Sequence, residues 1–298
     1  NTENELAYVR VVAYQPDGNF IEDTVWVNAP DYMENLDIQF VELFITVLDK
    51  EKHPVMGLEQ ESFTVFEDGS PQQVRRFEKV TNLPIHAGIL LDVSASMEDN
   101  LETALKAALK FLEDVVTPKD RATIVTFNDH PNLAVKFTND MPELASGLAG
   151  LRAERGTALY DSVIFSLYYF NGIKGQRALI LLSDGRDEHS RFAWEDTLEY
   201  ARRAGVSIYS IGLTLGKKGG DAKKKLIKLA EETGGRSFFV DSVDDLAEIY
   251  RIIQEELRSR YFVAYQSSNT AEDTAFRTVE VEVEQPGLEA KTLRGYYP

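Results

Sequence analysis

From residue 86 onward, short apolar runs alternate with segments that have the hydrophobic period of a helix. Strands that alternate with helices in this way form a parallel sheet covered by helices on both faces. The sequence therefore predicts an α/β domain with a doubly wound, mostly parallel sheet. In the first helical segment the apolar side chains recur at steps of three and four residues, at Leu101, Ala104, Ala108, Phe111 and Val115. The expected strands are AGILLDV, ATIVTF, RALILLSD, VSIYSIGL and SFFV.

Strand-like segments flank this region on both sides, at 36–80 and from 261 to the end of the chain. Each flank has too few strands to bury a sheet face by itself. We therefore expect residues 36–82 and 259–298 to form one immunoglobulin-like β-sandwich, with the α/β domain, residues 84–258, inserted into it. Such an insertion is possible because the two ends of a doubly wound domain can lie close together.

Residues 1–30 contain two β-rich arms around Pro-Asp-Gly-Asn, a sequence typical of a hairpin turn. Two interpretations of this β-hairpin stay open: the end of an upstream immunoglobulin-like domain, or an extra hairpin on the same sandwich. Because the first residue is Asn rather than Met, we expect a piece of a longer protein.

Composition limits the classes of partner. The 32 basic and 49 acidic residues give a formal net charge of −17, which repels nucleic acid and anionic membranes and attracts divalent cations. No apolar run reaches the length of about 18 residues that a membrane span needs, so we expect no direct membrane insertion. The absence of cysteine excludes disulfides, thiolate metal sites and a cysteine nucleophile.

Polar side chains gather at three places near predicted strand ends. Asp92, Ser94 and Ser96 follow the first strand of the α/β domain. Asp184 ends a later strand, and Thr157 lies at the start of a predicted helix. Loops that leave the carboxyl ends of the strands in such a sheet form its usual ligand site. Two carboxylates and three hydroxyls make an oxygen-only set, which suits a hard cation such as Mg²⁺.

These residues also carry a family resemblance. The D-x-S-x-S run at 92–96, Thr157 within GTALYD and Asp184 within LLSDG resemble the von Willebrand factor A domain with a complete metal-ion-dependent adhesion site (MIDAS). The resemblance covers roughly residues 84–258. The flanking β segments resemble those of bacterial secreted proteins in which such a domain sits within a β-sandwich. This implies an extracytoplasmic location: secreted, periplasmic or at the cell surface.

The resemblance implies a role for each of the five residues. In this family, hydroxyls such as those of Ser94, Ser96 and Thr157 bind the metal directly. Acids such as Asp92 and Asp184 act largely through waters or hydrogen bonds. A cation with little direct negative charge stays electrophilic, so an Asp or Glu carboxylate of a protein partner can fill its open position. Mg²⁺ is the expected ion, and Mn²⁺ and Ca²⁺ stay open as alternatives.

Simpler interpretations compete with some of these roles. An acid before serine at a strand end is often a helix N-cap, which is the alternative for Asp92 taken alone. Glu98, Asp99 and Asn100 resemble a second, adjacent metal site of integrin β-subunits, but acids in a first helical turn also complement the helix dipole without any metal. Asp187 and Glu188 are expected to be solvated loop acids, and a supporting role behind the metal ligands stays open as the alternative.

Other motifs in the sequence do not indicate a catalytic or ligand-binding site. The segment LGKKGGDAKKK lacks the residue order of a phosphate-binding loop, so we expect a solvated loop and helix face. The four histidines have no ligand spacing, and only His189 lies near the predicted rim. No base accompanies Ser94 or Ser96 in the sequence, which argues against a serine nucleophile.

We therefore expect a non-enzymatic, adhesion-type module that binds an acidic residue of a protein partner through a metal ion. The alternative is a structural or assembly component of a bacterial envelope complex, in which the metal stabilises the fold. A metallohydrolase fits least well, because hydrolysis needs a metal-activated water and usually a positioned base.

Overall fold

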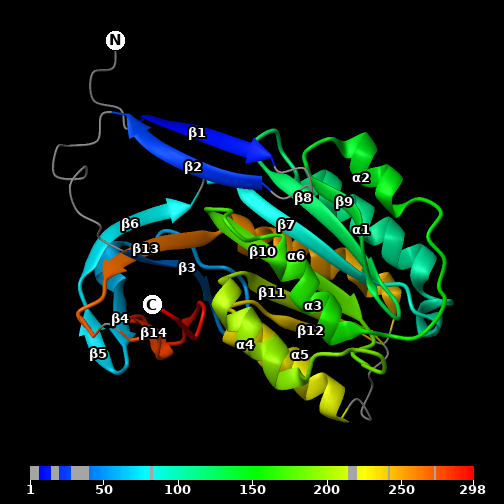
Figure 1. The fold of residues 1–298 in the computed structure, drawn as a ribbon. Helices are drawn as coiled ribbons and strands as arrows, with labels where there is room; N and C mark the ends of the chain where they lie inside the picture. The colour runs from blue at the N-terminus through cyan, green and yellow to red at the C-terminus, as the bar shows by residue number, and fades with distance from the viewer. Residues whose placement is uncertain are drawn as a thin grey trace.

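A computed structural model of the chain describes residues 7–14, 20–27, 40–80, 83–213, 220–240, 242–271 and 273–298. Figure 1 shows an α/β part with a central sheet and, beside it, a part that consists of strands. Within the described ranges, no helix combines the length and the apolar character that a membrane span requires.

The α/β part is built on six strands: β7 (Ile85–Asp92), β8 (Arg121–Phe127), β9 (Pro131–Thr138), β10 (Gln176–Ser183), β11 (Ser207–Leu213) and β12 (Ser237–Val240). Their order in the sheet is β12-β11-β10-β7-β8-β9. All neighbours are parallel except β8 and β9, which pair antiparallel. The prediction of an α/β domain with a mostly parallel sheet is therefore confirmed.

Helices cover both faces of this sheet: α1 (Leu101–Val115), α2 (Met141–Leu148), α3 (Leu159–Tyr168), α4 (Trp194–Ala204), α5 (Gly220–Glu232) and α6 (Leu246–Arg258). One hydrophobic cluster joins α1, α2 and α6 to one face, and a second joins α3, α4 and α5 to the other. β7 is buried along its whole length because it serves both clusters, with Ile89 and Leu91 in the first and Leu90 in the second. This double burial explains why the central strands are continuous apolar runs.

The sequence prediction missed β9. This strand lies at the edge of the sheet and begins with Pro131. Its pattern mixes exposed, half-buried and buried positions, so it lacks the apolar run that identified the other strands. Proline has no backbone N–H to donate, and an edge strand tolerates it because one side of the strand has no neighbouring strand.

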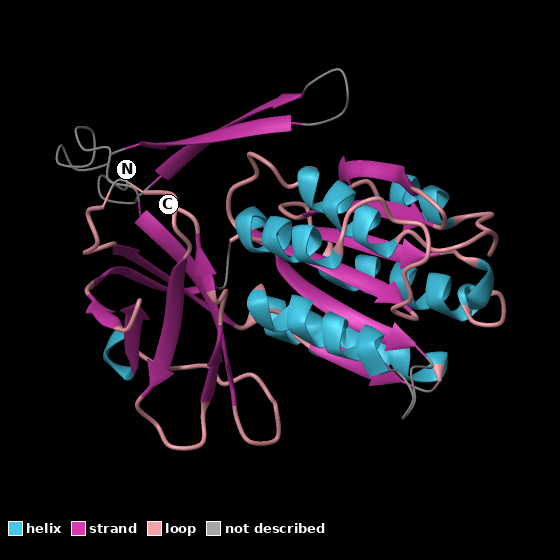
Figure 2. Cartoon of the chain, turned by 60° about the horizontal axis from the view of Figure 1, so that its bottom comes forward, coloured by secondary structure: helices cyan, strands magenta, loops and turns pink. Residues whose placement is uncertain are grey.

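The all-strand part contains two four-stranded sheets, in the orders β15-β3-β13-β6 and β16-β14-β4-β5 (Figure 2). Their strands are β3 (Phe40–Leu48), β4 (Phe63–Glu67), β5 (Ser70–Gln72), β6 (Val74–Val80), β13 (Arg260–Gln266), β14 (Arg277–Val283), β15 (Glu289–Lys291) and β16 (Gly295–Tyr296).

Strands from before and after the α/β part pair with each other in both sheets. β13 lies between β3 and β6, and β14 pairs with β4. A single hydrophobic cluster includes Ile45, Val65, Tyr261 and Val279, one residue from each of four strands in the two sheets. The immunoglobulin-like class of this part and the domain limits given above stay predictions.

The two parts are closely joined. Only Ser259 separates the end of α6 from the start of β13. Arg260, the first residue of β13, is buried and donates a hydrogen bond of 3.0 Å to the hydroxyl of Tyr209 on β11. The all-strand part therefore contacts the base of the central sheet directly.

At the N-terminus, β1 (Ala7–Tyr14) and β2 (Phe20–Val27) form an antiparallel two-stranded sheet. The predicted turn at 16–19 lies outside the described residues. Whether this hairpin belongs to an upstream domain stays a prediction.

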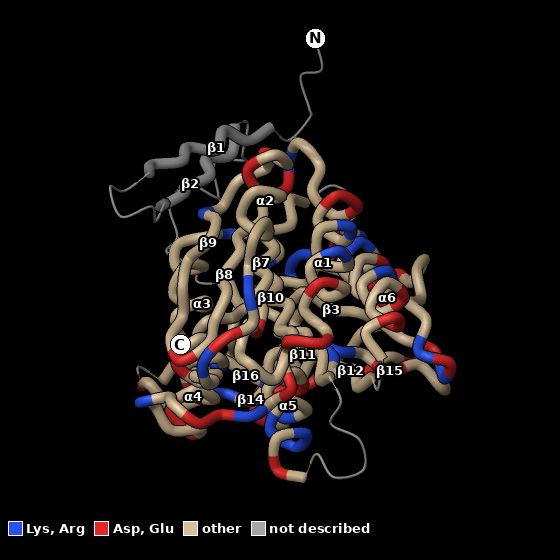
Figure 3. The backbone as a smooth tube through the Cα atoms, turned by 90° about the vertical axis from the view of Figure 1, so that its right-hand side faces the viewer, with Lys and Arg blue, Asp and Glu red and all other residues tan. Residues whose placement is uncertain are grey.

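Charged residues of both signs are spread over the surface helices (Figure 3). Several form ion pairs along one helix, such as Lys225 with Asp221 on α5 and Arg251 with Glu248 on α6. Exposed pairs of this kind contribute little to stability, because solvent and salt screen the charges.

Candidate functional site

The parallel strands of the central sheet point away from the all-strand part in both Figure 1 and Figure 2. Their carboxyl ends therefore form a rim at the far end of the molecule. Two of the loops that carry the predicted metal residues, those of Asp92 and Asp184, leave the sheet at this rim. The third, which carries Thr157, connects α2 to α3.

Asp92 is the last residue of β7 and is completely buried. Its Oδ1 accepts a hydrogen bond of 2.9 Å from the backbone N–H of Ser94. Its Oδ2 accepts one of 2.7 Å from the hydroxyl of Ser183, the last residue of the neighbouring strand β10. The carboxylate is thus fixed between two adjacent strand ends. Sequence reasoning missed Ser183, although its place directly before Asp184 was a usable signal.

Asp92 is not a helix N-cap, which removes the simpler interpretation of this residue. α1 begins after Asn100, and no side chain caps its N-terminus. The short 3₁₀ turn Ala95–Met97 also starts without a side-chain cap. Glu98 and Asp99 are exposed in the turn that leads into α1.

The hydroxyls of Ser94 and Ser96 lie side by side. Their Oγ atoms are 2.9 Å apart, with Ser94 buried and Ser96 exposed. Adjacent ligands of an octahedral Mg²⁺, which binds oxygen at 2.0–2.1 Å, are about 2.9 Å apart. The two hydroxyls therefore have the spacing that one cation needs.

Thr157 lies in the loop between α2 and α3 and is 4% exposed. The N-cap of α3 is Ala158, so the Thr157 hydroxyl does not occupy the capping position. Two backbone bonds tie this loop to the Asp92 loop: Glu154 N–H to the carbonyl of Val93, 2.9 Å, and Ala95 N–H to the carbonyl of Arg155, 3.1 Å.

Asp184 follows β10 and is 7% exposed. Its Oδ1 accepts a hydrogen bond of 3.1 Å from the N–H of Arg186, whose guanidinium lies 3.7 Å from Oδ2 but is largely exposed. The same loop donates two backbone bonds, from Glu188 and His189, to the carbonyl of Thr157, at 2.8 and 3.0 Å. The structure therefore brings all three predicted loops together at one rim.

The two carboxylates share an electrostatic environment. Burial raises the pKa of Asp92 to about 6, hydrogen bonds from Ser94 and Ser183 oppose this rise, and the like charge of Asp184 adds to it. Asp92 accepts bonds from neutral donors alone in the described part of the chain. A divalent cation at the rim would stabilise its ionised form and lower this pKa.

The donor set is rich in hydroxyls. Within the described ranges, no three or more His, Asp or Glu side chains converge in a group that could hold a metal. The fit to a cation therefore rests on the paired serine hydroxyls, Thr157 and the two acids. An oxygen-only set of this kind fits a hard ion such as Mg²⁺.

Asp187 and His189, at the rim, make contacts that the sequence did not predict. Asp187 was expected to be a solvated acid, but its Oδ1 accepts bonds from the N–H of Tyr160, 3.2 Å, and the hydroxyl of Ser190, 2.6 Å. The ring of His189 lies against Gly156, where an added Cβ would come within 2.2 Å of it. A residue larger than glycine at position 156 would therefore clash with this ring.

An aromatic groove of about 750 Å³ adjoins the rim. Its wall includes His189 from the Asp184 loop and His130 from the loop after β8. Tyr168 and Phe192, which are 47% and 50% exposed, also line it. Exposed aromatic side chains gathered in one groove are typical of a surface that binds another molecule.

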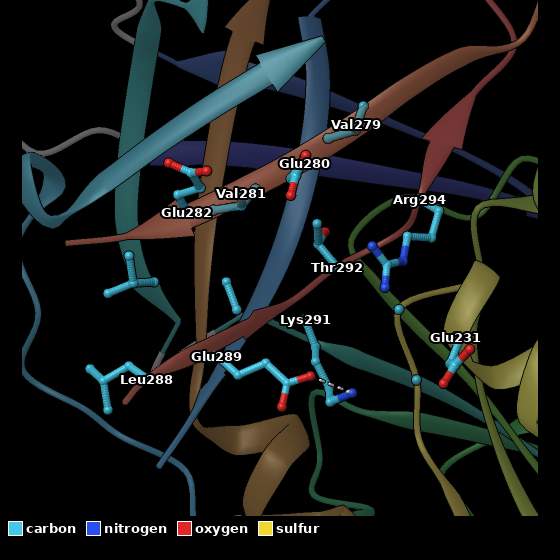
Figure 4. A pocket seen from close by; sticks show the side chains of 14 residues that line it. Glu231, Val279, Glu280, Val281, Glu282, Leu288, Glu289, Lys291, Thr292 and Arg294 are labelled. Atoms are coloured by element: carbon cyan, nitrogen blue, oxygen red, sulfur yellow. Dashed lines mark ion pairs between the residues drawn. The ribbon is translucent and has the colours of Figure 1, made fainter. Parts of the chain in front are cut away.

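A separate cavity of about 450 Å³ lies where β14 and β15 approach the end of α5 (Figure 4). Its charged side chains include Glu289 and Lys291, which form an ion pair of 3.2 Å with each other. The cavity lies at the junction of the two parts of the molecule and contains none of the predicted site residues.

A family model for the von Willebrand factor type A domain matches residues 88–252, more than half of the chain. A search of curated proteins found no match. Among solved structures, a von Willebrand factor type A protein from Catenulispora acidiphila is similar at a TM-score of 0.51 and 14% identity, over 88% of this chain and 75% of that one.

Two further structures show the same fold. The vWF domain of the type V pili tip protein Mfa5 from Porphyromonas gingivalis has a TM-score of 0.52 and 15% identity, over 58% of this chain and 94% of that one. Proximal thread matrix protein 1 from the mussel byssus, with a zinc-occupied MIDAS motif, has a TM-score of 0.51 and 18% identity, over 64% and 49%. Because the family model matches more than half of the chain, the chain belongs to the von Willebrand factor type A family.

Proposed function

We propose that this chain is a non-enzymatic module that binds a protein partner through a divalent cation at the rim. The observation that supports the proposal is that hydrogen bonds join three loops at one rim. These loops carry Asp92, Ser94, Ser96, Thr157 and Asp184. When bound, the ion supplies an electrophilic position to which an Asp or Glu carboxylate of the partner can bind.

Each residue has a distinct task in this proposal. Ser94, Ser96 and Thr157 hold the ion through their hydroxyls. Asp92, already held by Ser94 N–H and the Ser183 hydroxyl, orients this set and balances charge without contacting the ion directly. Asp184 acts in the same way from the neighbouring strand end. Mg²⁺ is the proposed ion, with Mn²⁺ or Ca²⁺ as substitutes.

A protein, rather than a small ligand, is the proposed partner because of the surface beside the rim. The groove that contains Tyr168 and Phe192 presents apolar area next to the ion. Such patches mark protein interaction sites. The rim also lies at the end of the α/β part that is far from the all-strand part (Figure 1).

The residues at the rim give less support to hydrolysis. The hydroxyl of Ser94 pairs with that of Ser96 rather than with a basic group. A general base must lie within hydrogen-bond reach of the group it activates. We therefore propose binding rather than catalysis, and an extracytoplasmic location like that implied by the name of the pilus tip protein.

A peptide display selection tests this function. The immobilised protein is selected against a random peptide library in MgCl₂, and the recovered peptides are then tested in EDTA. We expect recovered peptides to contain Asp or Glu and to lose binding in EDTA or on Ser94→Ala. Ser146→Ala, in an exposed position on α2, is the matched control that keeps binding.

Two results would contradict the proposal. Peptides that bind equally well in EDTA would show that the ion plays no part in recognition. A protein that Mg²⁺ stabilises but that yields no Mg²⁺-dependent peptide would instead favour the alternative role, in which the metal stabilises an assembly component.

A further inference from the structure

The N-terminus of α3 is capped by another loop. A helix leaves its first N–H groups without partners inside the helix, and a Ser, Thr, Asp or Asn at the N-cap usually satisfies one of them. The N-cap of α3 is Ala158, which has no side-chain acceptor. The missing acceptors come from residues 187–190, beyond the end of β10.

Asp187 and Ser190 act together as this cap. The Oδ1 atom of Asp187 accepts the N–H of Tyr160 at 3.2 Å and the hydroxyl of Ser190 at 2.6 Å. The same Ser190 oxygen accepts the N–H of Asp161 at 3.1 Å. Two of the free N–H groups of α3 are thus satisfied from the Asp184 loop.

Asp161 completes the link in the opposite direction. Its Oδ1 accepts the backbone N–H groups of Arg191 and Phe192, at 2.8 and 3.0 Å. An acid on α3 therefore holds the far end of the same loop. We call Asp161, Asp187 and Ser190 with these bonds the aspartate clasp.

The clasp connects two of the proposed metal-binding loops. Thr157 lies directly before the N-cap of α3, and its carbonyl accepts the N–H groups of Glu188 and His189. Asp184 lies three residues before Asp187 on the other loop. Any shift of the clasp would therefore change the position of Thr157 relative to Asp184.

We propose that Asp161 and Asp187 are positioning residues that hold Thr157 and Asp184 at the spacing a divalent cation requires; this inference rests on the proposed metal site. Oδ1 of each clasp acid accepts hydrogen bonds from protein donors, so each acid is placed to act through the loops that it joins. Groups that orient metal ligands in this way typically contribute 10- to 100-fold to metal affinity.

Titration calorimetry with MgCl₂ alone, at a pH above the pKa of Asp92, measures how the clasp changes the Kd for Mg²⁺. We expect Asp187→Ala and Asp161→Ala each to raise the Kd for Mg²⁺ by about 10- to 100-fold. Glu188→Ala is the charge-matched control, because Glu188 is an exposed neighbour in the same loop. It should leave the Kd close to that of the wild type.

A conservative variant separates positioning from charge. Asp187→Asn removes the negative charge but keeps an Oδ1 that can accept both bonds, so it should restore most of the Mg²⁺ affinity lost in Asp187→Ala. Equal weakening by Asp187→Asn, Asp187→Ala and Glu188→Ala would show a charge effect and overturn the inference. If an alanine variant of a clasp acid does not fold, Ser190→Ala, which removes two clasp bonds, takes its place with the same expected direction.

The outcomes distinguish this inference from the proposed function. No Mg²⁺ binding by the wild type would overturn both. Binding that is lost in Thr157→Ala but unchanged in Asp161→Ala and Asp187→Ala would keep the metal site and overturn the clasp alone.

Discussion

The hydroxyl of Ser183 donates a hydrogen bond of 2.7 Å to the buried carboxylate of Asp92, across the ends of two adjacent parallel strands. This bond joins the first and the last of the three rim loops. It also satisfies an oxygen that has no access to solvent.

Ser183→Ala should destabilise the metal-free protein. The substitution leaves Oδ2 of Asp92 buried without its donor, and an unsatisfied buried acceptor costs about 1–3 kcal/mol. Urea denaturation measures the free energy of unfolding, with Ser146→Ala, an exposed serine on α2, as the control. Equal stability of the two variants would mean that the bond to Asp92 contributes nothing.

A second buried carboxylate lies at the opposite end of the sheet. Asp120 is completely buried and accepts hydrogen bonds from Arg258, 2.5 Å, and from the N–H groups of Ile85 and Thr117, 2.8 and 3.0 Å. Although burial raises it, these bonds hold the pKa of Asp120 below its usual value. Asp120→Ala should therefore reduce the free energy of unfolding by about 3 kcal/mol at neutral pH.

The stability lost on substitution of Asp120 should become smaller as the pH falls. Because the pKa is lowered in the folded state, Asp120 stabilises the fold above its unfolded pKa, about 3.9, and this contribution disappears as the pH falls through the lower, folded value. The difference between wild type and Asp120→Asn should thus shrink in acid. Asp114→Asn, which breaks a more exposed pair with Lys110, is the control. A difference that stays constant from pH 7 to strong acid would refute the assignment.

Burial explains how much of the fold the sequence could predict. Strands such as β7 and β10 are buried on both faces, so their sequences are continuous apolar runs that can be recognised as buried strands. β9 is an edge strand with mixed exposure, and its sequence lacks that signal. The sequence predicted that the two flanking β segments lie together. It did not predict that β13 pairs with both β3 and β6, because local patterns do not specify pairing between segments more than 150 residues apart.

The same distinction applies to the site. Asp92 ends one buried strand and Asp184 directly follows another, so their places at the rim could be inferred from the strands alone. Ser183, Asp161 and Asp187 act through bonds that depend on loop conformation, and the partner of Ser183 is 91 residues away. No local pattern separates such residues from solvated ones, so the sequence favoured a solvated position for Asp187 over a supporting role behind the metal ligands.

The aromatic groove gives a prediction about recognition. Phe192→Ser should weaken binding of the Mg²⁺-dependent peptides at least severalfold, because truncating an aromatic anchor in an interface often costs more than 1 kcal/mol. The Mg²⁺ affinity of the Phe192→Ser variant should stay unchanged. Phe40→Ser, a similarly exposed aromatic residue on β3, is the matched control. If both variants bind the peptides equally well, the groove has no part in recognition.

Metal binding should also raise stability. A ligand that binds one site of the folded state alone adds about 2.7 kcal/mol at a hundred times its Kd. Adding MgCl₂ to the metal-stripped protein should therefore raise its melting temperature, and Asp184→Ala should abolish the increase. Glu188→Ala should keep it. An increase that survives Asp184→Ala would place the ion elsewhere.

Anomalous diffraction from a crystal soaked in MnCl₂ tests the central claim most directly. Manganese scatters anomalously, whereas the light atoms of the protein contribute little at the same wavelength. We predict one strong peak within about 2.6 Å of the hydroxyl oxygens of Ser94, Ser96 and Thr157, with no direct contact to Asp92. A map without a peak at this rim, or with its main peak at another place in the molecule, would contradict the account.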